Sequence, residues 1–140
     1  MGDFVNVCLT SCQKVFVERD YRHGFYGTRF MEQMPEQLHN CVPYDDWIVT
    51  IKTINDLLEE LEAVSAKSIL RTTFSILTCT VGDVFNKAVT SAKRKEILDF
   101  IHRRNKEVFH SAGFHIDNPF DCGLRMIQIS ILSTGKILDR

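Results

Sequence analysis

Near its N-terminus the chain carries an alternating, β-prone pattern. In the stretch KVFVERDY, residues 14–21, the β-prone Val-Phe-Val is followed by three charged residues and a tyrosine, which is typical of a strand that runs out to the surface. Gly24 and Gly27 follow as turn residues. We therefore expect the short run Thr28–Met31 to pair back on the first strand as a hairpin.

Three later stretches place apolar residues at helical spacing. Residues 43–64 begin with Pro43 and two aspartates, which favours a helix start, and the exposed face of this helix is acidic. The stretch Ser68–Asn86 has threonine and serine opposite its apolar stripe, so packing must stabilise it as a helix. A third helix, around Val89–Phe109, is rich in lysine and arginine.

The last pattern lies in residues 117–132, DNPFDCGLRMIQISIL. Pro119 suits the start of a single helical turn and Gly123 its end, and the isoleucines of MIQISI alternate as on one face of a strand. The predicted order is ββαααβ. This is an α+β fold in which a small antiparallel sheet, made of the N-terminal hairpin and the C-terminal strand, packs with three helices.

Composition and charge indicate one ordinary domain. The 140 residues are 44% hydrophobic and 25% charged, which is enough for one core. We expect residues 1–13 to be an N-terminal segment that could be disordered, residues 14–132 to be the domain, and residues 133–140 to be a C-terminal tail. The net charge of −1 gives no support for nucleic-acid binding.

The cysteines and the most apolar stretch bear on the compartment. The five cysteines contain no CxxC pair and follow no secretory signal, which indicates a protein that faces the reducing cytosol. Arg71 and Asp83 interrupt the apolar stretch Ile69–Phe85. We therefore do not expect this stretch to span a membrane.

Catalytic and metal-binding motifs are not evident in the sequence. The five histidines have no spacing that would put two metal ligands on one side of a helix. No cysteine lies in a nucleophile motif, and no glycine-rich phosphate loop occurs. We therefore expect no metal, no cofactor and no catalytic residue, although a stand-alone cysteine-dependent enzyme is an alternative that the sequence leaves open.

The basic helix has two interpretations. Lys93, Arg94 and Lys95 form either a solvated face or a surface that lies against anionic lipids, because an apolar helix directly precedes them. Each basic residue close to such a surface contributes about 1 kcal/mol. Several together would therefore matter where one would not.

Cysteine acylation is a related possibility. Cys79, in the apolar helix, is either a small buried residue or an S-acylation site. Cys8 and Cys12 lie close to the N-terminus and are further candidates. Asn6 stands where a myristoylation signal requires serine or threonine, so we do not predict myristoylation.

Five collinear stretches resemble one protein family. They are KVFVERDY (14–21), TRFMEQMPEQL (28–38), TIKTIN (50–55), HRRNKEVF (102–109) and NPFDCGLRMIQISI (118–131). Their order and spacing, from about Lys14 to Leu132, resemble the golgin subfamily A member 7 family, which includes the yeast Ras-modification accessory protein Erf4.

The resemblance implies a non-catalytic accessory subunit. Such a subunit forms a heterodimer with a DHHC-type palmitoyltransferase, stabilises it, and supports the palmitoylation and membrane targeting of Ras-like proteins. The catalytic cysteine, the zinc and the acyl-CoA would belong to that partner. The resemblance also implies a peripheral position on the cytoplasmic face of Golgi or endoplasmic reticulum membranes. An alternative is a peripheral Golgi trafficking adaptor that binds a coiled-coil golgin independently of acyl transfer.

One departure from the family concerns lipidation. Animal relatives carry a palmitoylated CxxC pair in the apolar helix, and the resemblance places Thr73 and Ile76 at those two positions here. The paired site therefore cannot be carried over. Cys79, one helical turn further on, is the nearest candidate.

The end of the first strand is the predicted partner-binding surface. Arg19, Asp20 and Tyr21 either cap the hairpin through a mutual Arg–Asp pair or present a charged and aromatic surface to the partner. Arg125 would join them if the terminal strand lies beside the first. The other residues that the family motifs add to this surface are Phe30, Pro35 and Leu124.

Overall fold

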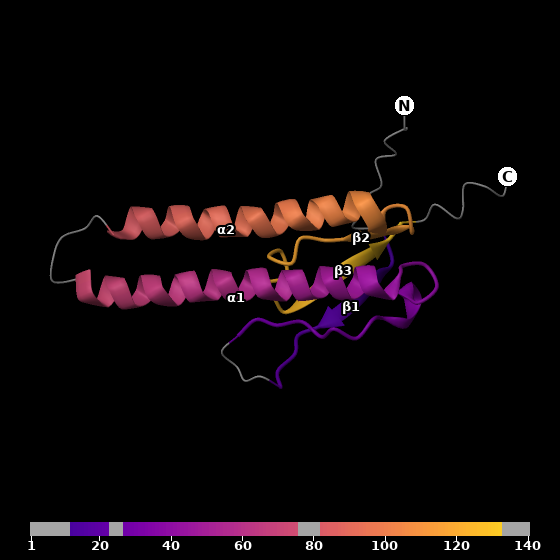
Figure 1. Ribbon diagram of the computed structural model, residues 1–140, viewed down its shortest axis with the longest axis horizontal. Coiled ribbons are helices and arrows are strands. Elements are labelled where there is room, and N and C mark those ends of the chain that lie inside the picture. Colours follow the sequence, from indigo (N-terminus) through magenta and orange to yellow (C-terminus); the bar gives the residue numbers. More distant parts are fainter. Residues whose placement is uncertain (1–11, 23–26, 76–81, 133–140) are drawn as a thin grey trace, which may run out of the picture.

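The computed structural model describes residues 12–22, 27–75 and 82–132 of the chain. In it, a three-stranded antiparallel sheet packs against two long helices that run side by side in opposite directions (Figure 1). The elements in chain order are β1 (Lys14–Glu18), the 3-10 turn η2 (Glu36–Leu38), α1 (Tyr44–Ser75), α2 (Gly82–Arg104), the π-helical turn η3 (Asn105–Phe109), β2 (Phe114–Ile116) and β3 (Met126–Ile131). The predicted α+β class and the antiparallel sheet are confirmed.

The sheet has the strand order β1-β3-β2. Val15 of β1 and Ile116 of β2 both pair with Ile129 of the central strand. Because side chains alternate along a strand, these three point into the core. Phe16 points to the other face, and 51% of its side chain is exposed.

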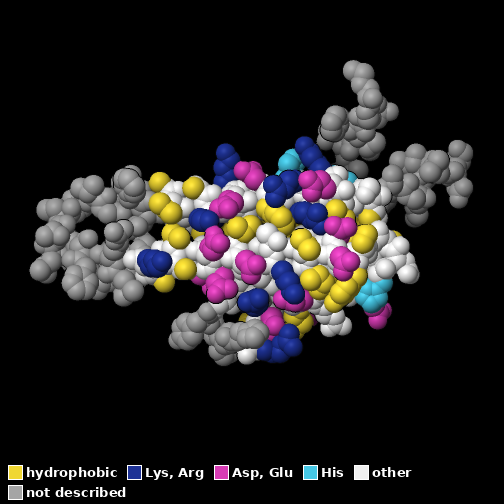
Figure 2. Space-filling view, in the orientation of Figure 1, with side chains coloured by type: hydrophobic (Ala, Val, Ile, Leu, Met, Phe, Trp, Pro, Cys, Tyr) yellow, Lys and Arg dark blue, Asp and Glu magenta, His cyan; other side chains and the backbone are white. Residues whose placement is uncertain are grey.

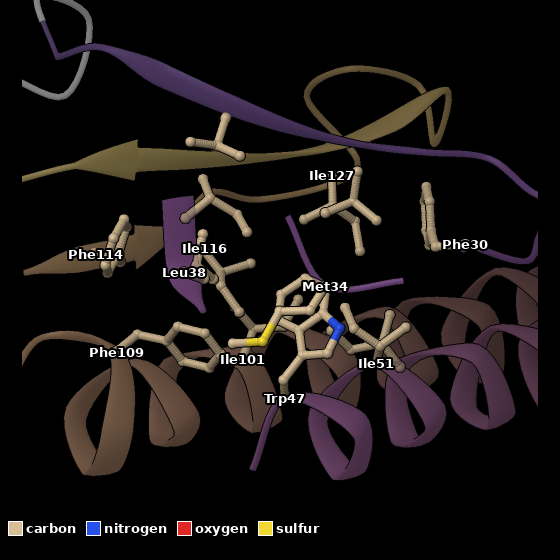
Figure 3. Packing of buried hydrophobic residues seen from close by; sticks show 14 of the residues in the cluster. Phe30, Met34, Leu38, Trp47, Ile51, Ile101, Phe109, Phe114, Ile116 and Ile127 are labelled. Carbon is tan, nitrogen blue, oxygen red and sulfur yellow. The ribbon is translucent and has the colours of Figure 1, made fainter. Parts of the chain in front are cut away.

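A single hydrophobic core lies between the sheet and the two helices (Figure 3). Trp47 and Ile51 of α1 and Ile101 of α2 meet Ile127 of the sheet in this core, and Trp47 also donates its indole N–H to the carbonyl of Glu32 at 2.8 Å. Burial of each such apolar side chain stabilises the fold by about 1.5–3 kcal/mol. The spacing of the buried positions along α1 is the period that the sequence predicted.

The prediction of three helices was wrong, because the stretch Ser68–Asn86 is not one helix. Residues 68–75 are the last part of α1 and residues 82–86 are the first part of α2. Residues 65–81 contain no glycine or proline that could stop the first helix, and α1 continues to Ser75. The predicted basic helix corresponds to the C-terminal part of α2 together with η3.

The predicted hairpin was also wrong. Thr28–Met31 forms no strand, and an isolated bridge between Arg19 and Phe30 is what joins this segment to the end of β1. The strand that completes the described sheet is β2, which follows Gly113 with its φ of +81°. Three residues are too few to give an alternating pattern, so the sequence did not predict it.

Two buried asparagines fasten the sheet to the helices. Asn55 of α1 accepts a hydrogen bond from the Phe30 N–H (2.8 Å) and donates one to the Phe30 carbonyl (3.0 Å). Asn105 of η3 does the same with Ile116, accepting from its N–H (2.8 Å) and donating to its carbonyl (2.9 Å). Asn55 is 1% exposed and Asn105 is 2% exposed. We call these two contacts the asparagine clamps.

Arg104 fastens the two helices to each other. Its guanidinium donates to the Thr50 hydroxyl (2.9 Å), to the Asp46 carboxylate (2.8 Å) and to the Asp46 carbonyl (3.2 Å). Charge-assisted hydrogen bonds of this kind are stronger than neutral ones. The C-terminal end of α2 is thereby fixed beside the first turns of α1.

Candidate partner-binding surface

The Arg19 side chain lies where β1 runs out. Its guanidinium sits over the ring of Tyr21, 5.6 Å from the centroid, and one terminal nitrogen donates to the Gly27 carbonyl at 3.0 Å. Its Nε is buried and has no hydrogen-bond partner among the described residues. The cation and the aromatic ring therefore form one fixed unit, and 57% of the Tyr21 side chain is exposed.

Of the two interpretations of this cluster, the mutual Arg19–Asp20 pair is not the contact that Asp20 makes. Asp20 is 5% exposed and its carboxylate accepts three hydrogen bonds from Arg22, namely from the backbone N–H (3.0 Å), from Nε (2.9 Å) and from Nη2 (2.8 Å). Aspartates in turns commonly bond the backbone two residues ahead in this way. The negative charge of Asp20 is therefore directed to Arg22, and Arg19 is left to Tyr21 and Gly27.

A hollow of about 630 Å³ opens beside this cluster. Asp20 and Arg22 line it on one side and the segment from Arg29 to Gln33 lines it on the other. The Arg29 guanidinium lies 4.0 Å from Glu32 and 3.9 Å from Glu59, which is beyond hydrogen-bond range. A group presented by another molecule could compete for such a loosely held arginine.

The other predicted surface residues are found in different environments. Phe30 is 1% exposed and belongs to the core of the chain, so its assignment to the surface was wrong. Pro35 is half-buried directly before η2. Leu124 is half-buried against the core with a φ of 57°.

Arg125 lies at the same end of the sheet as Arg19. It is exposed and directly precedes Met126, which the strand register pairs with Glu18. The terminal strand therefore does lie beside the first one. The structure brings Arg19, Tyr21 and Arg125 to one end of the β1–β3 pair, whereas Phe30 is inside.

The three basic residues predicted to face a membrane have separate contacts. Lys93 donates to Glu60 of α1 at 2.7 Å and lies 2.9 Å from Glu96, and hydrogen bonding to Glu60 raises the Lys93 pKa. Arg94 lies over the ring of Phe120, 4.5 Å from its centroid. Lys95 is exposed. On the face that Figure 2 shows, positive and negative side chains are interspersed along the two helices.

Most of the lipidation candidates fall outside the described residues. These are Cys79 and Cys8, together with Ile76 of the family's paired position, whereas Thr73 lies within α1. Of the described cysteines, Cys12, Cys41 and Cys122 are in no disulfide.

Two histidines form a polar contact that the sequence did not indicate. His110 Nε2 lies 2.9 Å from His115 Nδ1, and the ring planes differ by 17°. One ring therefore donates an N–H to the other, which joins the end of η3 to β2. Burial lowers the pKa of both histidines, and positive neighbours act in the same direction. For His110 these neighbours are His102 and Lys106. For His115 they are His110, Lys14 and His102, whereas the Asp117 carboxylate acts to raise the His115 pKa.

Two kinds of feature are absent from the described part of the chain. There, no three histidine, cysteine, aspartate or glutamate side chains are grouped so that they could hold a metal ion. Within the same residues, no helix has both the length and the apolar character that crossing a bilayer requires.

Most of the chain matches one protein family. The family model described as Golgin subfamily A member 7/ERF4 family matches residues 14–128, from the first residue of β1 into β3. The chain belongs to this family. The match spans both asparagine clamps, Arg104 and the Arg19 cluster, and it covers every residue of the buried core except Ile129.

Individual members of the Golgin subfamily A member 7/ERF4 family agree along most of the chain. Golgin subfamily A member 7 of Gallus gallus is 29% identical over an alignment of 128 residues that covers 88% of this chain and 93% of that protein. The Homo sapiens protein of the same name is 27% identical over the same shares. Golgin subfamily A member 7B of Mus musculus is 31% identical over 84% of this chain and 70% of its own length.

Membership of the Golgin subfamily A member 7/ERF4 family supports an accessory, non-catalytic role at the level of the family. Several residues of the motifs that carry the resemblance have structural tasks: Thr50, Asn55, Arg104 and Asn105 all make the internal contacts described above. A polar residue within an apolar helical stripe is the signal that could have identified the asparagines, because buried amides require hydrogen-bond partners.

Proposed function

We propose that the chain is the non-catalytic accessory subunit of a DHHC-type protein S-acyltransferase. It binds the enzyme, stabilises it, and so supports the palmitoylation and membrane targeting of Ras-like proteins. The observation that carries this proposal is the family match across residues 14–128. The catalytic cysteine, the zinc and the acyl-CoA belong to the enzyme and not to this chain.

The surface that we assign to the enzyme is the end of the β1–β3 pair. Arg19, Tyr21 and Arg125 are gathered there, and Tyr21 and Arg125 are exposed. Arginine and tyrosine are enriched at the energetic centres of protein interfaces. The cation and ring are already fixed against each other, so little conformational freedom is lost when a partner binds them.

The proposed location is the cytoplasmic face of Golgi or endoplasmic reticulum membranes, with the chain held there peripherally. The relatives are named golgins, which supports the Golgi part of this proposal. Lys95 and Arg94 are the residues that contact lipid in this proposal, because the Lys93 ammonium is paired with the Glu60 carboxylate. Acylation of Cys79, Cys8 or Cys12 would add to this attachment, since a single fatty chain alone gives only marginal binding.

The golgin name also supports a second candidate function. In this function the chain is a peripheral trafficking adaptor that binds a coiled-coil golgin independently of acyl transfer. Golgi targeting that persists in cells lacking every partner DHHC enzyme would favour the adaptor. Loss of targeting in those cells would favour the accessory subunit.

Co-expression with the DHHC enzyme tests the leading proposal. The wild-type chain should co-purify with the enzyme and increase its yield and acylation rate. Arg19→Ala should reduce the enzyme recovered at least about tenfold, the loss expected for one central interface residue, with the thermal transition of the chain retained. The matched control is Lys52→Ala, which removes an exposed cation on α1 that is not part of the Arg19 cluster. This variant should behave as wild type.

Two outcomes would contradict parts of this proposal. Absence of any co-purification or effect on the enzyme would exclude the accessory role. Loss of the thermal transition in Arg19→Ala would make the Arg19 cluster structural rather than part of the interface.

A further inference from the structure

The outer edge of β1 carries main-chain groups that no described segment pairs with. The register joins Val15 to Ile129 and Val17 to Ile127, and the Gln13 carbonyl accepts from the Ile131 N–H. In an antiparallel ladder this pattern directs the main-chain groups of odd-numbered residues toward β3 and those of even-numbered residues away from it.

The end of the same edge confirms this direction. The Glu18 carbonyl accepts from Met31 and the Asp20 N–H donates to Arg29, so both even-numbered residues face outward. The N–H and carbonyl groups of Lys14 and Phe16 face the same way. Among the described residues, no backbone or side-chain group bonds them on that side.

At two other edge positions, Phe30 and Ile116, the asparagine clamps bond the outward-facing main-chain groups. Ile116 faces out from the β2 edge and Phe30 faces out from the segment that continues the β1 edge, and each is bonded at both N–H and carbonyl by a buried amide. The helices thus supply two specific partners for edge positions. From Lys14 to Val17 the described chain supplies none.

Three common protections of an exposed edge are also missing at this stretch among the residues that the structure describes. Natural edges are commonly guarded by proline, a bulge or a projecting lysine, and β1 contains neither a proline nor a bulge in its register. Its one lysine is withdrawn, because the Lys14 ammonium donates to Asp117 and to the Ser130 hydroxyl (2.6 Å), across the sheet and away from the edge. Beside it, half of the Phe16 side chain is exposed.

We propose that the edge of β1 from Lys14 to Val17 accepts an extended segment of the partner acyltransferase as an additional strand. This inference rests on the proposed function and states how the enzyme is held. The main-chain groups of Lys14 and Phe16 supply the hydrogen bonds. An aromatic or β-branched side chain of the enzyme packs on Phe16. The segment Arg29–Met31 ends the site, so the added strand covers about 13 Å, the length of four residues.

Residue-resolved hydrogen exchange of the full chain, alone and bound to the DHHC enzyme, tests the proposal. In the free chain the amides of Val15 and Val17 should exchange slowly and that of Phe16 quickly. Binding of the enzyme should slow the Phe16 amide at least about tenfold, as one new backbone hydrogen bond requires.

Two variants of Phe16 test the same edge by affinity. Phe16→Pro removes the outward N–H and leaves the bonds to β3 in place, and it should weaken enzyme binding at least about tenfold. Phe16→Thr keeps the N–H and removes the exposed ring, so it should weaken binding less. Thermal unfolding checks that each variant folds; if the proline variant does not, the exchange result and Phe16→Thr decide.

The outcomes separate the two proposals. If the wild-type chain binds no DHHC enzyme, both fail. If the enzyme binds while the Phe16 amide still exchanges quickly and Phe16→Pro binds as wild type, the added strand alone is excluded. If the Phe16 amide is slow in the free chain and becomes fast when residues 1–11 are deleted, the chain's own N-terminal segment occupies the edge, which also overturns the inference.

Discussion

At the β2 edge of the sheet, Asn105 bonds both main-chain groups of Ile116, whereas at the β1 edge the main-chain groups of Lys14 and Phe16 meet no described segment. Both edges belong to one three-stranded sheet. The difference is that η3 supplies a buried amide to β2, while no helix side chain reaches the start of β1. A side chain on a helix can thus do the work of a neighbouring strand.

The same comparison applies within the β1 side. Asn55 closes the segment at Phe30, and the Thr28 N–H is bonded by Glu62 at 2.7 Å. Only about the first half of this edge is therefore without a helix-borne partner in the described chain. In this fold, the outward-facing main-chain groups of an edge are therefore bonded by individual side chains at individual positions rather than by a further strand.

Removal of the β2 clamp should give the largest effect. Asn105→Ala would leave a buried N–H and a buried carbonyl of Ile116 without partners, and we expect the free energy of unfolding to fall by about 2–4 kcal/mol. Urea denaturation measures this loss. Asn118→Ala, which changes an asparagine in the exposed turn before Asp121, is the control and should cost less. Equal losses in the two variants would mean that the clamp contributes nothing specific.

Removal of the clamp at Phe30 should cost slightly less. In Asn55→Ala the segment still donates hydrogen bonds to the Glu62 carboxylate and to the Glu18 carbonyl, and Trp47 still donates to the Glu32 carbonyl. It can therefore shift to admit water, and we expect a loss of about 2–3 kcal/mol. Hydrogen exchange should accelerate at Phe30 and Met31 while the β2 amides keep their rates. Faster exchange at β2 as well would show that the edges are not independent.

Acidification should give the smallest effect and act on the β2 side. The pKa values of His110 and His115 are lowered by burial, so below the ordinary histidine pKa of about 6.5 the unfolded chain binds more protons than the folded one. Their contribution to stability is fully present above that pH and is lost as the pH falls toward the folded-state pKa values. Urea denaturation across this range measures it.

The matched control for acidification is the double variant His110→Gln/His115→Gln. Its free energy of unfolding should depend less on pH than that of the wild-type chain. A wild-type chain that becomes more stable as the pH falls below about 6.5 would contradict the assigned direction of both pKa shifts.

The strands that were predicted correctly are those with a clear alternation. In KVFVE buried and exposed residues alternate, and in MIQISI the isoleucines at 127 and 129 are buried in the core, so both are strands with the expected core faces. The start of α1 at Tyr44, just after Pro43, was likewise readable from turn chemistry. The helix ends were not readable, because periodicity continues across residue 64 without a stop signal.

The site was less accessible to sequence reasoning. Adjacent charges suggested that Arg19 pairs with Asp20, but the turn folds Arg22 back onto Asp20. Phe30 looked like part of a partner motif, although its position is fixed by the Asn55 clamp inside the core. Both contacts depend on long-range or turn geometry, which neighbouring residues in the sequence do not encode.

The asparagine clamps also bear on how this sequence can change over time. In each clamp the asparagine amide bonds only the main-chain N–H and carbonyl of the residue that it holds, and it makes no hydrogen bond to that residue's side chain. At positions 30 and 116 the requirement is therefore one of volume alone, since any apolar side chain that fills the space leaves the clamp intact. The side chains at positions 30 and 116 can therefore change during evolution while the architecture of the fold is kept.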